Sequence, residues 1–529
     1  MLVNDEEEKS NGTRCLFQPV VKIKSEVNGF RFCEYSSLVD FNVLDAEEQS
    51  LELQYRNKRV YGTGLGTSVN WDIDTDGKGE IYNDFFPEVE VPSMDFSIPQ
   101  GLGIHKDALS MRHLSDLDNT EKPQKLSELR SVVDAYGSWI DTLIDKQKEL
   151  SGCYQSAAKV NIEGCLKAKS RMLAGLKILN DNSSAWTAFS LANRAMFMQR
   201  VHLKLQSDMA DVDRYPGDEE LTKSLETMNY SETNGITGDN YAWRLFQIAF
   251  LLMSIESITN DSACDRDVVD LIWFPTGGGK TEAYLGLTAF TIFFRRLAHL
   301  PESDGTTVIM RYTLRLLAAQ QFTRASTLIC ACEYIRSDAV SRRPKYGKYP
   351  LGNTEITIGL WIGREHIPNT NTDAKKHLKE LNDARTDTLQ YAKEQHNKFQ
   401  VLKCPWCGTK LVKDRIGTKM VGTFGYRMRN NRHFELFCPQ ESCFFNQQGK
   451  LPIQIIDEEL YACPPTLLFG TVDKFAMLPW KKEIGAFFAA GSDNRTPDLV
   501  IQDELHLISG PLGTMVGSVS YTHLTLPTT

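Results

Sequence analysis

The chain has 529 residues, of which 41% are hydrophobic and 24% are charged, the composition of an ordinary folded protein with several domains. A formal net charge of −9 at pH 7 argues against a basic protein that coats nucleic acid, although it permits a local basic groove. The longest apolar runs are too short to span a membrane, and the acidic N-terminus is neither a secretory signal nor a transit peptide. We therefore expect a cytoplasmic protein with no membrane partner and with reduced cysteines.

Residues 1–110 predict a β-rich N-terminal module. Short alternating segments in this region are separated by turn residues, as in a series of short strands. Gly62, Gly64 and Gly66 are closely spaced, but no long helix follows them as a dinucleotide site would require. We interpret these glycines as strand or turn residues.

Residues 111–240 predict a helical module that ends in a polar, acidic linker. The apolar spacing predicts helices over residues 126–143, 155–179 and 184–202. Ser184 is the expected N-cap of the third helix. Trp139 and Trp186 are expected in the core, because apolar positions at helical spacing usually face it.

The strongest signal in the chain is a strand, a glycine-rich loop and a helix, in that order. Residues 268–274 are apolar and rich in β-branched side chains, which predicts a buried strand. The sequence Pro-Thr-Gly-Gly-Gly-Lys-Thr follows at 275–281, and residues 282–300 have the apolar spacing of a helix. The general phosphate-loop pattern has a glycine where this chain has Phe274, and the loop instead resembles motif I of superfamily 2 helicases. A glycine-rich turn before a core helix is the alternative, and the flanking strand and helix argue against it.

This order of elements predicts a site for ATP and Mg²⁺. Backbone N–H groups of the glycines and the N-terminus of the helix bind phosphate oxygens. Lys280 is expected to reach the β- and γ-phosphates, and the Thr281 hydroxyl is expected to hold Mg²⁺. The predicted loop residues are Thr276, Gly277, Gly278, Gly279, Lys280 and Thr281.

A glutamine lies just upstream, on an amphipathic helix expected to start near Tyr241. In helicases a glutamine in this place contacts the adenine edge. Gln247 is therefore a candidate to read the base, with Trp243, Arg244 or Phe246 nearby. The alternative is a surface glutamine on a core helix.

Residues at the ends of further strands are candidates for nucleic-acid contact, because open parallel sheets bind ligands at the carboxyl ends of their strands. The apolar pattern predicts strands at 306–312, at 355–361 and from Pro465, and a helix at 314–335. Arg311, Thr313 and Arg315 lie where helicase motif Ia grips the sugar–phosphate backbone, and Gly470 and Thr471 resemble motif Ib. The alternative for Arg311 and Arg315 is that they are solvated surface charges.

Residues 366–450 predict an insertion made of a charged helical arm and a zinc ribbon. Cys404 and Cys407 form one pair and Cys438 and Cys443 another, and four thiolates satisfy a tetrahedral, structural Zn²⁺. His433 is expected to be a bystander. Basic and aromatic residues between the pairs favour a nucleic-acid or partner surface. They are Arg415, Lys419, Tyr426, Arg427, Arg429 and Arg432.

A short buried strand predicted at 497–502 ends in two adjacent carboxylates. Asp503 is expected to hold Mg²⁺ through water, and Glu504 to orient or deprotonate the attacking water. His506 is expected to couple the nucleotide site to the nucleic-acid site. Together these residues resemble the Asp-Glu-x-His motif of helicases.

Longer runs resemble the helicase subunit of DISARM, an anti-phage defence system of bacteria and archaea. The resemblance is carried by residues 61–66, 188–196, 243–247, 271–286, 468–475 and 503–506. It spans most of the chain. It implies ATP- and Mg²⁺-dependent action on DNA beside a second defence subunit.

We predict an α/β fold in which residues 241–365 and 451–518 form the first RecA-like lobe of a P-loop motor. The zinc-ribbon insertion interrupts this lobe, and the β-rich and helical modules precede it. Residues 519–529 fit no helix or strand pattern and are expected to be a non-native tail. A helicase needs a second RecA-like lobe to close on ATP. We expect this chain, a fragment without that lobe, to bind nucleotide weakly at best.

For the full-length parent we predict an ATP-dependent DNA helicase or translocase. An RNA helicase or a restriction-type translocase is the alternative within the enzyme class. A nucleotide-binding scaffold without motor activity is the alternative outside it. The adjacent carboxylates favour hydrolysis, and the missing second lobe favours binding alone.

Overall fold

The chain divides into two compact units in a computed structural model, one of Met1–Asp95 with Gly137–Lys167 and one of Phe96–Tyr136 with Ala168–Thr529. The structure describes residues 19–25, 30–34, 41–84, 95–117, 120–209, 213–228, 230, 241–272, 278–312, 315–345, 347–363, 367–383, 397–412 and 423–503, with the backbone alone at 315–320. Among the helices it describes, none combines the length and the apolarity needed to cross a bilayer.

The first unit contains a three-stranded antiparallel sheet in the order β1-β3-β2. Its strands are β1 (Lys22–Lys24), β2 (Ser68–Ile73) and β3 (Gly79–Asp84). The sheet agrees with the β-rich character expected of this region. Helix α1 (Ala46–Tyr55) was not predicted, and it begins at a capping box between Asp45 and Glu48.

Three long helices follow where helical spacing predicts them. They are α3 (Lys122–Gln147), α4 (Gly152–Asp181) and α5 (Ser183–Asp208). The N-cap of α5 is Asn182 and not Ser184, because the Asn182 side chain accepts the Ala185 N–H at 3.0 Å. Trp186 is buried as expected, whereas Trp139 is 44% exposed and the prediction for it is wrong. The core that buries Val132 and Val133 on the same helix does not extend to Trp139.

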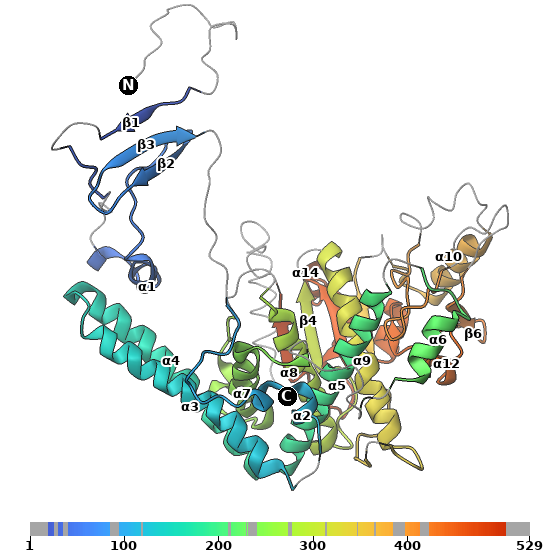
Figure 1. Cartoon of the computed structure of the whole chain (residues 1–529). Helices are drawn as coiled ribbons and strands as arrows, with labels where there is room; N and C mark the ends of the chain where they lie inside the picture. The colour runs from blue at the N-terminus through green and yellow to red at the C-terminus, as the bar shows by residue number, and fades with distance from the viewer. Residues whose placement is uncertain are drawn as a thin grey trace, which may run out of the picture. The chain divides into compact units, whose positions relative to one another are not determined.

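A parallel five-stranded sheet in the order β10-β4-β9-β5-β8 lies at the centre of the second unit (Figure 1). Its strands are β4 (Val308–Tyr312), β5 (Ile358–Trp361), β8 (Ile453–Gln454), β9 (Leu467–Thr471) and β10 (Leu499–Gln502). The mixed α/β class is thereby confirmed. Because the strands run in one direction, their carboxyl ends meet at one edge of the sheet.

Alternate side chains of the strands enter two separate cores, so the sheet is covered on both faces. Val308 and Met310 of β4 lie in the larger core with helices α8 (Lys280–Ala298) and α9 (Arg315–Ala339). Helix α5 packs against both of these helices. Ile309 lies in the smaller core on the opposite face. That face is covered by α13 (Asp457–Ala462), α14 (Val472–Phe475) and the 3-10 helix η8 (Lys482–Phe488).

The buried strand predicted at 268–274 is wrong for residues 268–272, which are irregular and open to solvent. Val269 is 81% exposed and Leu271 is 71% exposed. Asp270 is held instead by a two-pronged ion pair with Arg171, at 2.6 and 2.7 Å. Among the described strands none pairs with the outer side of β10, and Val500 of β10 is 54% exposed. Tertiary pairing, and not β propensity, therefore decided the conformation of this segment.

The remaining elements are short or peripheral. They are η2 (Phe41–Val43), η3 (Lys106–Leu109), α2 (Met111–Leu114), α6 (Glu219–Glu226), α7 (Leu245–Thr259), η5 (Cys264–Asp267), α10 (Asn371–Asp383), β6 (Tyr426–Arg429), β7 (His433–Leu436) and α12 (Phe444–Gln447). Strands β6 and β7 form an antiparallel hairpin between the two cysteine pairs.

Candidate functional site

The glycine loop ends at a left-handed residue that only glycine adopts easily. Gly279 is the N-cap of α8 and has a φ of +85°. A Cβ atom there would lie 2.8 Å from the Gln247 Nε2 atom and 3.2 Å from the Arg244 Nη1 atom. Lys280 and Thr281 follow as the first residues of α8, where the helix dipole favours a bound anion. Thr276 and Gly277 lie outside the described residues.

Two side chains at the start of α7 hold this loop by its backbone. The Gln247 Nε2 atom donates to the Gly279 carbonyl at 2.7 Å, and the Arg244 guanidinium donates to the Gly278 carbonyl. The Gln247 Oε1 atom accepts the Arg244 N–H at 2.8 Å. Gln247 therefore lies at the predicted loop, and its contacts in this structure are with protein backbone. The Arg244 guanidinium also stacks 3.7 Å from the Phe96 ring centre. No local sequence pattern predicts this contact.

An acidic residue in the first turn of α8 joins the loop helix to its neighbours. Glu282 is 6% exposed and forms ion pairs with Arg200 of α5 and Arg324 of α9. The apolar spacing assigned Glu282 only to the predicted helix at 282–300 and did not predict its ion pairs. The alignment of three helices, which the sequence does not reveal, brings the three charges together.

The two side chains predicted to hold Mg²⁺ meet at one tyrosine hydroxyl. The Tyr284 hydroxyl lies 2.8 Å from Asp503 Oδ2 and 3.2 Å from Thr281 Oγ1. The Tyr312 hydroxyl lies 3.5 Å away from it. Burial, and then the Asp503 carboxylate, raises the pKa of Tyr284, so its hydroxyl stays protonated. The hydroxyl and carboxylate oxygens present here are the ligand types that suit Mg²⁺.

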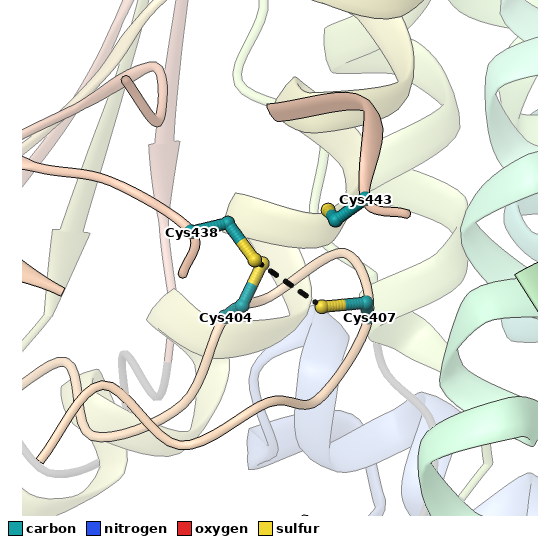
Figure 2. Close-up of side chains that lie close together, drawn as sticks. All are labelled: Cys404, Cys407, Cys438 and Cys443. Atoms are coloured by element: carbon teal, nitrogen blue, oxygen red, sulfur yellow. Dashed lines mark hydrogen bonds between the residues drawn. The ribbon is translucent and has the colours of Figure 1, made fainter. Parts of the chain in front are cut away.

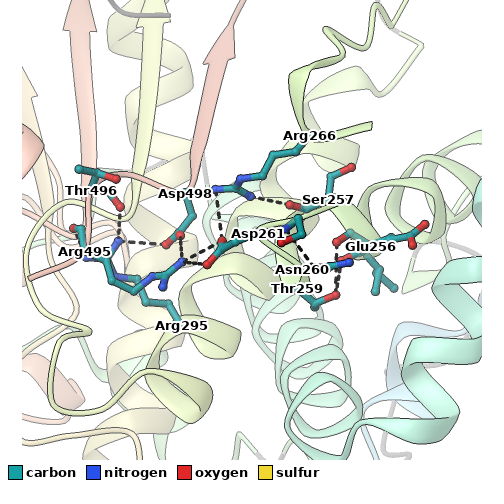
Figure 3. A network of polar contacts seen from close by, with 12 residues as sticks. Glu256, Ser257, Thr259, Asn260, Asp261, Arg266, Arg295, Arg495, Thr496 and Asp498 are labelled. Atoms are coloured by element: carbon teal, nitrogen blue, oxygen red, sulfur yellow. Dashed lines mark hydrogen bonds and ion pairs between the residues drawn. The ribbon is translucent and has the colours of Figure 1, made fainter. Parts of the chain in front are cut away.

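An ion-pair network links helix α8, which carries Thr281, to strand β10, which directly precedes Asp503 (Figure 3). The buried Arg295 guanidinium of α8 donates to Asp498 at 2.9 Å and to the Thr496 carbonyl at 2.8 Å, just before β10. Arg495 in turn pairs with Asp261 at 2.9 Å, in the turn after α7. These contacts anchor the end of α8 and the start of β10 in one place. Glu504 and His506 lie outside the described residues.

The predicted nucleic-acid residues that are described lie at the carboxyl edge of the sheet. Arg311 pairs in register with Gly470 on β9 and with Gln502 on β10, and Thr471 follows. Arg311, Gly470 and Thr471 are all buried, and burial lowers the pKa of Arg311. A Cβ at Gly470 would lie 2.6 Å from the Phe475 ring, so packing alone demands glycine there. Thr313 and the Arg315 side chain lie outside the described residues.

The four predicted cysteines gather as expected (Figure 2). The sulfur atoms of Cys404, Cys407, Cys438 and Cys443 lie within 4.8 Å of one another, and all four residues are buried. Burial opposes ionisation of Cys407, but hydrogen bonds from the other three thiols and Thr409 outweigh it and hold its pKa well below the usual range. Four converging sulfurs fit a tetrahedral metal such as Zn²⁺. His433 pairs with Glu459 at 2.7 Å and is not part of this cluster.

The loop between Cys404 and Cys407 is packed onto helices α5 and α9. The His202 ring of α5 stacks on Trp406 at 3.5 Å, and its Nδ1 atom lies 2.6 Å from the Trp406 carbonyl. A carbonyl oxygen only accepts, so Nδ1 carries the hydrogen; burial lowers the pKa of His202 to about 4, which keeps the ring neutral. Gln206 of α5 and Thr327 of α9 both donate to the Pro405 carbonyl, at 2.7 and 2.9 Å.

The basic residues of the hairpin between the cysteine pairs are partly neutralised. Arg427 and Arg429 of β6 both pair with Glu435 of β7, at 3.1 Å each. Tyr426 is buried, and its hydroxyl donates to the Val401 carbonyl, so it belongs to the core of the ribbon. Arg432 is exposed at the tip of the hairpin. Arg415 and Lys419 lie outside the described residues.

Comparison with known proteins finds a relative for almost the entire chain. No protein-family model matches it. The chain is 32% identical, over 568 aligned positions, to the DISARM protein DrmA of Bacillus paralicheniformis. The alignment covers 98% of this chain and 45% of the relative, so the chain spans a little less than half the length of that protein.

Proposed function

Because the chain is DrmA-like over nearly its whole length, we propose that it is the nucleotide-binding part of an ATP-dependent DNA helicase or translocase in a DISARM defence system. The observation that supports this most is the meeting of Thr281 and Asp503, far apart in the chain, at one hydroxyl beside the N-terminus of α8. A phosphate-binding helix end beside a carboxylate is the arrangement that a metal–nucleotide complex needs.

Each site residue has a proposed role. Lys280 binds the β- and γ-phosphates, and Gln247 holds the loop in shape from behind. Thr281 and Asp503 hold Mg²⁺, which neutralises charge on the phosphates when bound. Glu504, directly after Asp503, is the proposed base for the attacking water. His506 is proposed to couple nucleotide to nucleic acid.

The cysteine cluster has a structural role in this proposal. Four buried thiolates leave a bound Zn²⁺ without an open position, which excludes a catalytic use of that metal. The bound DNA is proposed to cross the carboxyl edge of the sheet near Arg311, Thr313, Arg315, Gly470 and Thr471, and a second defence subunit is the proposed partner.

Binding of labelled ATP to the purified chain, with Mg²⁺ present, tests the proposal. We expect Lys280→Ala to weaken binding about tenfold or more, since a charge-assisted phosphate contact is lost. Lys223→Ala, at an exposed lysine on α6, is the matched control and should bind as the wild type does. Equal affinity of the wild type and Lys280→Ala would overturn the assignment of the nucleotide site. Binding without nucleic-acid-stimulated turnover in the full-length parent would favour the scaffold alternative.

A further inference from the structure

The Tyr284 hydroxyl contacts both proposed Mg²⁺ ligands. It donates to Asp503 Oδ2 at 2.8 Å, and it is also placed to donate to Thr281 Oγ1 at 3.2 Å. Both of these oxygens can accept a hydrogen bond, so one hydroxyl lies within hydrogen-bond distance of both side chains.

These two contacts have a consequence for cation binding. Each contact restricts the rotamer of the side chain it reaches, so the Thr281 hydroxyl and the Asp503 carboxylate are held in defined orientations. Side chains that orient metal ligands in this way strengthen metal binding without touching the metal.

We propose that Tyr284 is a positioning residue for the Mg²⁺ site, and that its hydroxyl sets the orientation of both Thr281 and Asp503. The inference rests on the proposed function, because it assumes that these two residues serve a metal–nucleotide complex. It adds a residue that lies in the second turn of α8, four residues after Lys280.

Packing alone does not explain a tyrosine at this position. The side chain is 5% exposed and lies in the main core, where a phenylalanine ring would fill the same space. Burying a hydroxyl is unfavourable unless hydrogen bonds replace its contacts with water. Here the two shorter contacts, at 2.8 and 3.2 Å, go to the two proposed ligands, and the longer one, at 3.5 Å, goes to the Tyr312 hydroxyl.

The test compares Tyr284→Phe with the wild type in two titrations. Affinity for labelled ATP is measured first in EDTA and then across a range of Mg²⁺ concentrations. We expect the Mg²⁺ concentration at half effect to rise about tenfold in Tyr284→Phe, as is usual for loss of such a partner. Nucleotide affinity in EDTA should stay the same. An unchanged Mg²⁺ requirement in the variant would overturn the inference.

Two further variants separate positioning from a general loss of stability. Tyr426→Phe removes another buried hydroxyl, in the cysteine ribbon, and should leave the Mg²⁺ titration unchanged. In an Asp503→Asn background, Tyr284→Phe should have a smaller effect than it has alone, because part of its effect acts through the Asp503 carboxylate. Additive effects of the two changes would contradict the inference even if each variant is less stable.

The outcome also distinguishes this inference from the proposed function. If Mg²⁺ does not change nucleotide binding by the wild type, the proposed function fails and the inference fails with it. If the wild type responds to Mg²⁺ and Tyr284→Phe responds equally, the inference alone fails.

Discussion

At the scale of single residues, Glu282 shows how a charged side chain can stabilise the helix start next to the glycine loop through ion pairs with other protein residues. It is nearly buried in the first turn of α8 and pairs with one arginine from α5 and one from α9. A carboxylate in the first turn of a helix also interacts favourably with the helix dipole. The residue therefore fixes the start of α8, where Lys280 and Thr281 lie.

We expect Glu282→Ala to lower the free energy of unfolding by about 2 kcal/mol, since two arginines lose their charged partner. Both arginine side chains are about a third exposed, and solvent screening keeps the effect below that of a fully buried pair. Chemical denaturation measures the change. Glu163→Ala removes an exposed partner of Lys159 and should change stability by less than about 0.5 kcal/mol. Equal effects of the two substitutions would contradict the role of Glu282.

At the scale of elements, helices α5 and α9 connect the cysteine cluster with the glycine loop before α8. Helix α5 contributes Arg200 to Glu282 and His202 to the loop that carries Trp406. Helix α9 contributes Arg324 to Glu282 and Thr327 to the same loop. The same two helices therefore contact both sites.

Metal removal tests this connection. We expect the purified chain to contain about one Zn²⁺, and chelation to lower its thermal midpoint by about 10 °C or more, because bound metal stabilises the folded ribbon. Affinity for labelled ATP should fall as well, since α5 and α9 lose part of their packing. Elemental analysis, thermal scanning and nucleotide titration measure the three effects.

Cys438→Ser should reproduce the effect of the chelator, whereas Cys463→Ser, at an exposed cysteine outside the cluster, should not. A chain that keeps its midpoint after its metal is removed would contradict a structural role for the cluster.

At the scale of the whole molecule, the charge balance restricts where nucleic acid could bind. With a net charge of −9, the chain has no general attraction for a polyanion, so a contact must come from a small basic surface. The hairpin of β6 and β7 offers one such surface. Arg432 is exposed at its tip, and Arg429 forms an ion pair with Glu435.

We expect the double variant Arg429→Ala and Arg432→Ala to weaken DNA binding by the chain in the same proportion for all DNA sequences. The slope of log affinity against log salt should fall by about one per lost phosphate contact. Fluorescence anisotropy at several salt concentrations measures both. Arg130→Ala, at an exposed arginine of α3, is the control. An unchanged salt slope would exclude this hairpin from the DNA surface.

The sequence by itself determined much of the local structure. Apolar runs located β4 and the start of β9, and helical apolar spacing located α8 within two residues of its observed bounds and α5 except for its last six residues. Loop glycines and paired cysteines are equally local signals, because the backbone geometry and the ligand set they imply depend on near neighbours.

Only the tertiary structure decided which distant side chains meet and which apolar residues are covered. Tyr284 reaches Asp503, Glu282 reaches two arginines, and His202 stacks on Trp406, all through the packing of elements that are far apart in the chain. For the same reason Trp139 and residues 268–271 are exposed although their local pattern predicts burial. An apolar pattern shows what a segment could bury, but burial requires a neighbour, and only the folded chain determines where neighbours lie.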